Sequence, residues 1–578
     1  MISYGSLFNS RTVSVAAAVL LAFIALVRIV STYSQTAQAF DEPCHVAAAI
    51  EFLDLHRYTL DPVHPPLARI AIGLPLYLAG ERYPNLPVTD QPISYNDVGN
   101  GVLYDSGHYL RNLRLARMGV LPFFLLATAI VFLWARGEYG NLAGVMAVAL
   151  FTTLPNVLAL SSIAYTDIVA ASTQLLLLFT FCQWLQKATT RSAAWLGAAA
   201  GLALLSKATT LLFFPAAAIA IVLAKWISTR TFAGENIAAK IIVRHIAIVL
   251  VLVCVIVWAG YGFAVGHVDE ALNLSPASMP SFQHFPAPLA RTGRWLISSN
   301  PRVPAPALIK GLAVALVLNT TRPAAYLLGH IKEGGWWYFF LIGVAVKSPL
   351  PFLILALVGA VSLRGFDSRQ RWQALAPVLA AIAVLLVTMP VKYNAGVRHV
   401  LIVFPLLAIV AGQGCSYLWH MQGRGRPAAR VALISLLCWQ CVSSARASGD
   451  FLAYFNELAG SDPSRVMVAG CDLDCGQDLF LLAHEFQARQ ISHATLAIWT
   501  SADPSRMNLP KFDVPEANRP VTGWFAISLR ALRFGDSFHM TYPPGAFDWL
   551  SAYQPVARVG KTILLYDIPQ DKRTPETQ

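Results

Sequence analysis

Asp41-Glu42-Pro43-Cys44-His45 follows the first long apolar run of the chain, residues 12–30. Two adjacent carboxylates therefore stand where an apolar helix would emerge from a membrane. A second polar motif, His64-Pro65-Pro66-Leu67, comes soon after the first. We expect the rest of the chain to hold these groups near a membrane surface.

The composition is that of a membrane protein. Of 578 residues, 56% are hydrophobic and 13% are charged, whereas a soluble protein carries roughly 25% charged residues. A bilayer core needs about 20 apolar residues per helix. The sequence therefore predicts a polytopic α-helical membrane protein with about eleven transmembrane helices, at residues 12–30, 117–135, 142–164, 168–186, 193–206, 208–225, 243–263, 336–363, 373–390, 398–418 and 428–446. The short pair 193–206 and 208–225 could also form one kinked or re-entrant element, hinged at Ser206-Lys207.

The distribution of basic residues orients these helices. Short loops at 187–191, 225–244, 364–371 and 424–430 are rich in Lys and Arg, which indicates the cytoplasmic side. Eleven helices that start from a cytoplasmic N-terminus place the 41–45 motif, residues 165–167, Lys207, the 264–335 loop and the C-terminal tail outside. The net charge of +12 is concentrated in short loops between helices, so we expect no nucleic-acid partner.

The chain divides into a membrane domain, residues 1–446, and a small soluble α/β domain, residues 447–578. In the membrane domain, residues 31–116 form a first outer loop, and an amphipathic piece at 65–80 is too short to span and should lie in the interface. Residues 264–335 form a long outer loop, which is either a functional lid or a partly disordered insertion. In the C-terminal domain, Cys471 and Cys475 are close enough for a local disulfide, with two free thiols as the alternative.

Asp41, Glu42 and Asp167 are the candidate acids. A carboxylate at the membrane surface could act as a general base on an acceptor hydroxyl, which typically accelerates a reaction about 10²- to 10⁴-fold. The alternative for Asp41 and Glu42 is a solvated loop or a helix cap. For Asp167 the alternative is a cap of the helix that begins near residue 168.

Positive charge also gathers on the predicted outer face. Arg111, Arg114 and Arg117 form a stripe at helical spacing, and Lys207, Lys347, Lys392 and Arg398 add to it. Anchoring to lipid headgroups would explain these residues, and so would an anionic ligand, because the guanidinium group pairs with phosphate in bidentate geometry. His64 and His399, each taken alone, are more typical of packing or hydrogen bonding. The sequence shows no metal-ligand spacing and no phosphate-binding glycine loop.

Taken in order, the motifs resemble those of GT-C glycosyltransferases that use polyprenyl-phosphate sugars. They are DEPCH (41–45), HPPLARIAIGLPL (64–76), YTD (165–167), GLALLSK (201–207), GGWWYFFLIGVAVKSPLP (334–351) and GVRHVLIVFPLLAIVAG (396–412). The nearest branch resembles bacterial relatives of dolichyl-phosphate-mannose–protein mannosyltransferases and of lipid A aminoarabinose transferases. FLAYFNELAG and CDLDCGQDL, at 451–460 and 471–479, resemble a tail segment that usually reads close to DSNLDWGQDL. Cys475 replaces the usual Trp there, so the role of the tail is open.

The resemblance implies an inverting transfer of a sugar from a polyprenyl-phosphate donor to a hydroxyl of a glycan, lipid or protein acceptor. Asp41 would act as base, Glu42 would tune or orient it, and Asp167 matches the second outer acid. The donor phosphate would lie against His64, Arg111, Arg114, Lys207 and Arg398, and the long loop would cover the acceptor. The resemblance implies no required cofactor and leaves a divalent metal open. It places the enzyme in a bacterial inner membrane, with its active site and C-terminal domain on the periplasmic face.

Two other function classes are alternatives. A secondary transporter would also have about eleven helices, but transporters often show internal repeats, and the sequence shows no convincing one. A catalytically silent scaffold of the same fold is the second alternative, and the intact Asp41-Glu42 pair argues against it. The sugar, the acceptor, the polyprenol and the oligomeric state are left open.

Overall fold

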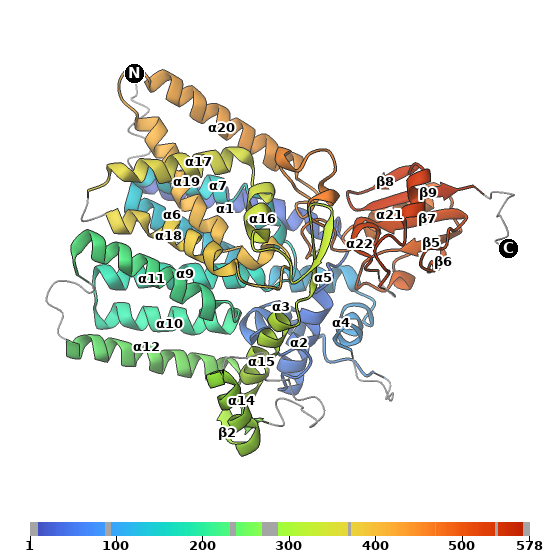
Figure 1. Ribbon diagram of the computed structural model, residues 1–578, viewed down its shortest axis with the longest axis horizontal. Helices are drawn as coiled ribbons and strands as arrows, with labels where there is room; N and C mark the ends of the chain where they lie inside the picture. Colours follow the sequence, from blue (N-terminus) through green and yellow to red (C-terminus); the bar gives the residue numbers. More distant parts are fainter. Residues whose placement is uncertain are drawn as a thin grey trace.

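The computed structural model describes residues 10–86, 94–231, 239–268, 287–367, 371–468, 470–537 and 541–569. Long helices lie roughly side by side along one direction, and a sheet-containing domain stands at one end of them (Figure 1). The helices are α1 (Arg11–Ser31), α2 (Glu42–Leu55), α3 (Pro66–Leu78), α4 (Tyr95–Tyr104), α5 (Tyr109–Met118), α6 (Leu121–Tyr139), α7 (Asn141–Phe151), α8 (Pro155–Ser161), α9 (Asp167–Gln186), α10 (Thr190–Ser206), α11 (Thr210–Thr229), α12 (Ala239–Gly260), α14 (Ala287–Ser299), α15 (Pro306–Thr320), α16 (Phe339–Lys347), α17 (Leu350–Ser362), α18 (Arg371–Thr388), α19 (Val403–His420), α20 (Arg426–Arg446), α21 (Leu479–Ala488) and α22 (Leu529–Phe534).

Among the described residues, seven helical stretches are long and apolar enough to cross a membrane, and nine if each of two bent pairs counts as one span. The bent pairs are α7–α8 and α16–α17. The sequence predicted about eleven spans, and the two remaining ranges, 193–206 and 398–418, correspond to α10 and α19. These two helices are weaker candidates, since α10 has 17 residues and α19 carries Gln413 and His420. The multi-span helical class is confirmed, with a candidate count of seven to nine.

Proline explains both bends. The axis turns by 67° between α7 and α8 and by 110° between α16 and α17. Leu154 precedes Pro155 and is extended, and Ser348 precedes Pro349 and is extended. A residue before proline is disfavoured in the helical conformation because it would clash with the proline ring. The chain therefore stops one helix at these points and starts the next in a new direction.

Glycines allow α17, α19 and α7 to pack closely. A Cβ atom at Gly359 would lie 2.0 Å from the carbonyl oxygen of Val410, and one at Gly412 would lie 2.4 Å from that of Ala143. Small residues at such contacts are typical of helix packing in membranes, where close van der Waals contact replaces the hydrophobic drive. α19 is thus in close contact with α17 on one side and with α7 on the other.

The C-terminal domain contains a five-stranded mixed sheet in the order β6-β5-β7-β9-β8. β5 is parallel to β6 and to β7, whereas β9 is antiparallel to β7 and to β8. The strands are β5 (His493–Ala497), β6 (Lys511–Asp513), β7 (Gly523–Ser528), β8 (Ala557–Val559) and β9 (Ile563–Ile568).

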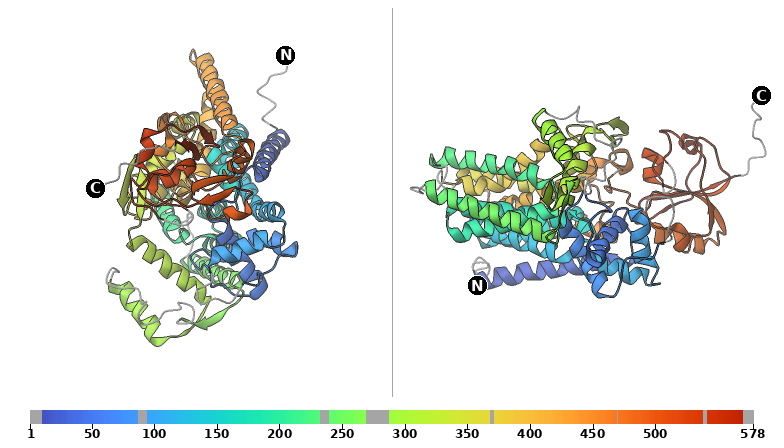
Figure 2. Two further views of the ribbon diagram at one scale, coloured as in Figure 1. Left: turned by 90° about the vertical axis from the view of Figure 1, so that its right-hand side faces the viewer. Right: turned by 90° about the horizontal axis from the view of Figure 1, so that it is seen from below.

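The described part of the long 264–335 loop is folded. It contains α14, α15 and two pairs of antiparallel strands, β1 (Val265–His267) with β2 (Arg302–Pro304) and β3 (Ala324–Leu327) with β4 (His330–Glu333). α15 packs on the segment before α3, where a Cβ atom at Gly311 would meet the Pro62 carbonyl oxygen at 2.1 Å. Residues 269–286 lie outside the described part. The sheet domain and the short helices α2, α3 and α4 gather at the same end of the bundle (Figure 2), and the predicted site residues lie there.

Candidate active site

Asp41 lies at the start of α2, beside Arg398. Its carboxylate oxygen Oδ2 is 2.6 Å from Nη1 of Arg398, and the two side chains are 30% and 15% exposed. Arg398 comes from the short helical turn Val397–Val400 before α19. The first outer segment and the segment before α19 therefore meet, and Asp41 keeps access to solvent while it is paired.

Glu42 points in the opposite direction, into the protein. Its two carboxylate oxygens each lie 2.8 Å from a nitrogen of Arg117, and both side chains are 0% exposed. The same carboxylate accepts hydrogen bonds from the backbone N–H groups of Ala39 and Ala164, each at 2.7 Å. With all its acceptor positions in use, Glu42 joins three segments of the chain and has no oxygen free for a substrate.

Asp167 is the first residue of α9, and it is paired with Lys207. Lys207 Nζ lies 2.5 Å from Asp167 Oδ1, and the two side chains are 9% and 2% exposed. Lys207 occupies the break between α10 and α11, so the helix is interrupted at the predicted hinge. Arg398 is within electrostatic range of Asp167: burial lowers the pKa of Arg398, but Asp41 and then Asp167 raise it above its ordinary value.

His64 lies in the loop before α3 and is neutral at physiological pH. Burial lowers its pKa to about 4, and the nearby cations Arg69 and Lys207 act in the same direction while Asp61 opposes them. Its ring meets that of His45 edge to face, with ring centroids 5.4 Å apart. His64 can thus offer a hydrogen bond to an anion but no net charge.

A buried ion pair fixes the loop that carries His64. Arg69 of α3 binds both the carboxylate and the backbone carbonyl of Asp61, and the Cys44 thiol donates to Asp61 Oδ2 at 3.0 Å. Burial alone would raise the pKa of Asp61, yet Arg69 holds it below its ordinary value. The Asp61 charge is therefore retained inside the protein, and it ties α2 to α3 below the site.

Arg111 and Arg114 do not join this cluster. Arg111 pairs with Glu81 at 2.6 Å and is 47% exposed, and Arg114 is exposed on α5. Both lie toward the polar end of the molecule, but among the described residues neither contacts the Asp41–Arg398 pair. Only Arg117, the third member of the stripe, is buried.

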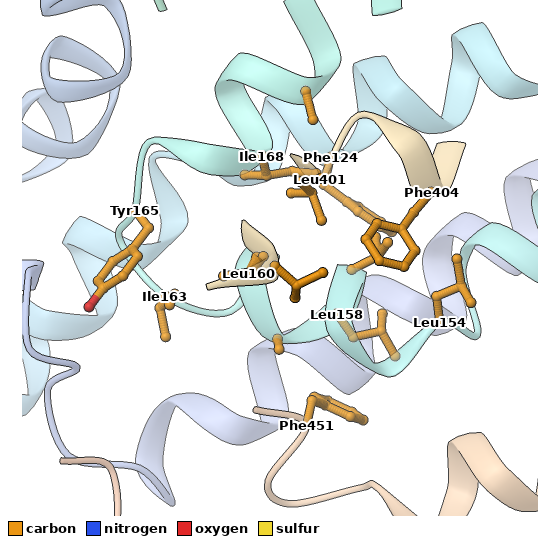
Figure 3. Packing of buried hydrophobic residues seen from close by; sticks show 14 of the residues in the cluster. Phe124, Leu154, Leu158, Leu160, Ile163, Tyr165, Ile168, Leu401, Phe404 and Phe451 are labelled. Atoms are coloured by element: carbon orange, nitrogen blue, oxygen red, sulfur yellow. The ribbon is translucent and has the colours of Figure 1, made fainter. Parts of the chain in front are cut away.

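Tyr165 is a site residue that the sequence analysis did not single out. Its hydroxyl accepts a hydrogen bond from the backbone N–H of Asp41 at 2.8 Å, and the Arg398 guanidinium lies over its ring, 5.1 Å from the centroid. The ring is turned away from the apolar packing of Leu158 and Phe404 (Figure 3). The sequence could have indicated Tyr165, because this residue is the first of the 165–167 motif. Arg117 was equally visible as the third arginine of a helical stripe.

The site thus contains two acid–cation pairs and neutral histidines. Asp41–Arg398 and Asp167–Lys207 carry two negative and two positive charges, so the cluster has no net charge. His45 Nδ1 and His399 Nε2 are buried and have no hydrogen-bond partner among the described residues. Within those same residues, no group of three or more His, Cys, Asp or Glu side chains is placed to bind a metal ion. Such a cluster can accept a proton and can bind an anion once a pair opens.

Residues 112–259 match the family model of dolichyl-phosphate-mannose-protein mannosyltransferases. The fold is similar to ArnT from Cupriavidus metallidurans bound to undecaprenyl phosphate, with 13% identity, a TM-score of 0.50, and coverage of 95% of this chain and 97% of that one. The oligosaccharyltransferase AglB from Archaeoglobus fulgidus, in complex with an inhibitory peptide and a dolichol-phosphate, gives 13% identity, a TM-score of 0.44 and coverage of 75% and 56%. No curated protein matches the chain in sequence.

Proposed function

We propose that this chain transfers a sugar from a polyprenyl-phosphate donor to an acceptor hydroxyl, with inversion at the anomeric carbon and with Asp41 as base. Residues 112–259 match the family model of dolichyl-phosphate-mannose-protein mannosyltransferases, which are glycosyltransferases. The observation that carries this proposal is the partly exposed Asp41–Arg398 pair at 2.6 Å. It places a proton acceptor directly beside a cation suited to phosphate.

The step is a single displacement. The acceptor oxygen loses its proton to the Asp41 carboxylate as it bonds to the anomeric carbon. The bond between that carbon and the phosphate oxygen breaks on the opposite side, and the electron pair leaves with the lipid phosphate. No covalent sugar–enzyme intermediate is needed, so the configuration inverts. General-base assistance of this kind is worth about 10²- to 10⁴-fold in rate.

Donor binding is coupled to release of the base. The cluster has no net charge, so an incoming phosphate gains a cation only when one acid–cation pair opens. Arg398 is the better candidate, because Lys207 and Asp167 are nearly fully buried and close at 2.5 Å. When the phosphate takes Arg398 from Asp41, the carboxylate becomes free to accept a proton. The neutral His64 and a second N–H of Lys207, which stays paired with Asp167, then complete the phosphate contacts.

The remaining predicted residues take supporting roles. Glu42 orients the segment that bears Asp41 and does not touch substrate, since its oxygens are all engaged. Arg111 and Arg114 are exposed and lie where they can attract the anionic lipid toward the cluster. The described part of the 264–335 loop packs beside the His64 segment through α15, which suits a cover for the acceptor. We propose the domain boundary at 446/447, where α20 ends.

We assign the active end to the periplasmic face of a bacterial inner membrane. The basic loops at 187–191, 225–244, 364–371 and 424–430 lie between the ends of the long helices, and such loops remain on the cytoplasmic side. The disulfide between Cys471 and Cys475, which lies against the site, suits an oxidising compartment. A glycan, lipid or protein on that face would be the acceptor.

Donor consumption tests this function. Purified protein in nanodiscs is incubated with undecaprenyl-phosphate sugars of several kinds, together with a periplasmic extract as acceptor source, and the lipid is followed by mass spectrometry. The proposal requires one donor to lose its sugar and the product to have the inverted anomeric configuration. Retained configuration, or no consumption of any donor, contradicts it. Movement of intact lipid or free sugar across the bilayer without glycan change would favour the transporter.

A further inference from the structure

The segment Cys471–Cys475 lies against the two chain segments that carry Asp41 and Arg398. Its two cysteines form a disulfide, and the sulfur atom of each is 3.3 Å from the Tyr165 hydroxyl. Disulfide sulfurs carry no hydrogen, so Tyr165 is the donor in this contact. Its oxygen in turn accepts from the backbone N–H of Asp41. The disulfide is thus linked to the proposed base through one tyrosine.

Backbone contacts connect the same segment to both catalytic residues. On one side, the N–H of Phe40, next to Asp41, donates to the Cys475 carbonyl oxygen at 3.1 Å. On the other, the N–H of Val397, next to Arg398, donates to Asp472 Oδ1 at 2.9 Å. One five-residue segment therefore holds the chain on either side of the Asp41–Arg398 pair.

The backbone of this segment would not keep its shape unaided. Gly470 and Gly476 flank it, both with positive φ, and Cys471 itself adopts a φ of 60°. Only glycine adopts that left-handed conformation without steric cost. The disulfide closes the loop from Cys471 to Cys475, and it therefore restrains Cys471, which adopts this conformation although it is not a glycine. Without the disulfide, the two sulfurs would move apart, from a bond length of about 2.0 Å to a contact distance of about 3.5–4.0 Å. They would then press against the buried Tyr165 hydroxyl, which contacts both of them.

We propose that the Cys471–Cys475 disulfide is a positioning element of the active site. In the oxidised protein it holds Tyr165 and the segments of Asp41 and Arg398 in register for sugar transfer. A dithiol reductant opens it: two electrons and two protons pass to the two protein sulfurs, and the reductant becomes a disulfide. The opened segment releases Tyr165 and transfer slows. This inference rests on the proposed function for its catalytic part, but its structural part is independent.

Hydrogen–deuterium exchange tests the structural part. The wild-type protein in nanodiscs is compared with and without dithiothreitol, alongside the variant Cys471→Ser/Cys475→Ser. Reduction should accelerate exchange of peptides covering 36–42 and 395–399 by about tenfold, because their amides bond to the segment. The serine variant should exchange at the faster rate in both conditions. Unchanged exchange in these peptides after verified reduction overturns the proposal.

Donor turnover tests the catalytic part. Reduction should lower kcat by about ten- to hundredfold, since small displacements of reacting groups have effects of this size, and reoxidation should restore it. The serine variant should have the low kcat and not respond to dithiothreitol, which excludes an effect through the other thiols. Faster exchange with unchanged kcat would make the disulfide merely structural and overturn the positioning role. If the oxidised wild type consumes no donor, the proposed function fails. Hydrogen–deuterium exchange alone then decides whether the disulfide holds the segments 36–42 and 395–399 in place.

Discussion

Asp41 and Glu42 are neighbours in the sequence, yet the fold gives them opposite environments. Asp41 is partly exposed and shares its charge with Arg398, whereas Glu42 is fully buried against Arg117. The sequence indicated both as acids of one motif but could not separate their roles. The separation depends on Arg117 and Arg398, which lie 75 and 357 positions away from their partners. Such long-range pairs leave no signal in local spacing.

Substituting Glu42 should therefore damage stability rather than chemistry. Glu42→Gln leaves the Arg117 guanidinium buried without a counter-charge, which costs about 3–5 kcal/mol. Thermal unfolding in detergent should show a clear loss of stability. Glu81→Gln is the matched control, since its partner Arg111 is half exposed and such pairs contribute below about 1 kcal/mol. Equal stability of the two variants would contradict the buried role of Glu42.

The coupling between donor binding and base release predicts opposite effects of one substitution. Asp41→Asn removes the charge that competes with phosphate for Arg398, so binding of undecaprenyl phosphate should tighten by about three- to tenfold, or about 1 kcal/mol. Binding is measured by titration of the lipid into nanodisc-embedded protein. Weaker binding by the variant would mean that Asp41 helps to hold the phosphate and that no exchange of partners occurs.

At the scale of elements, apolar periodicity and residues that stop a helix explain what could be predicted from the sequence. The helices, the break at Ser206-Lys207 and the amphipathic α3 follow from apolar periodicity and from residues that stop a helix. The segment 470–478 could not be placed in this way. Its contacts with Ala37, Phe40 and Val397 are tertiary, and its sequence shows only a pair of cysteines among aspartates.

Asp474, inside the disulfide segment, should make stability depend on pH. Burial raises its pKa to about 6, although hydrogen bonds from the Arg530 and Gly476 backbone N–H groups oppose the shift. In the unfolded chain the pKa is about 3.9, so between pH 4 and 6 the folded state binds more protons. Stability from this group is therefore present at about pH 4 and is lost as pH rises through about 6.

Comparison with Asp474→Asn isolates this effect. As pH increases from about 4 to about 7, the unfolding temperature of the wild type should fall relative to that of Asp474→Asn. Asp567→Asn, an exposed aspartate on β9, controls for the substitution itself. A difference between wild type and Asp474→Asn that is the same at both pH values would refute the assigned burial effect.

At the scale of the whole molecule, the C-terminal domain is part of the active end. The sequence indicated a domain of its own and left its role open, because Cys475 replaces the Trp of the related pattern. The structure shows that Lys347 of α16 donates to the carbonyl oxygens of Leu452 and Asp472, at 2.7 and 2.5 Å. Lys347, which falls within the predicted span 336–363, thus finds its hydrogen-bond partners in a segment more than a hundred residues later.

Ending the chain after Arg446 should therefore abolish transfer without preventing insertion. The spanning helices are all retained, but Lys347 loses both acceptors and the Asp41 segment loses its contacts with residues 475–477. Protease protection in membranes and donor turnover measure the two properties. Removal of residues 570–578 alone is the control and should preserve turnover. Residual turnover by the short chain would show that the domain is accessory.

The initial rate of donor consumption by Asp41→Asn tests the central claim most directly. It is compared with wild type and with Asp54→Asn, which changes another partly exposed carboxylate on α2 that lies near an arginine. The account predicts a loss of about 10²- to 10⁴-fold for Asp41→Asn, with normal folding, and a near wild-type rate for Asp54→Asn. A rate for Asp41→Asn within a few-fold of wild type would contradict the assignment of Asp41 as the base.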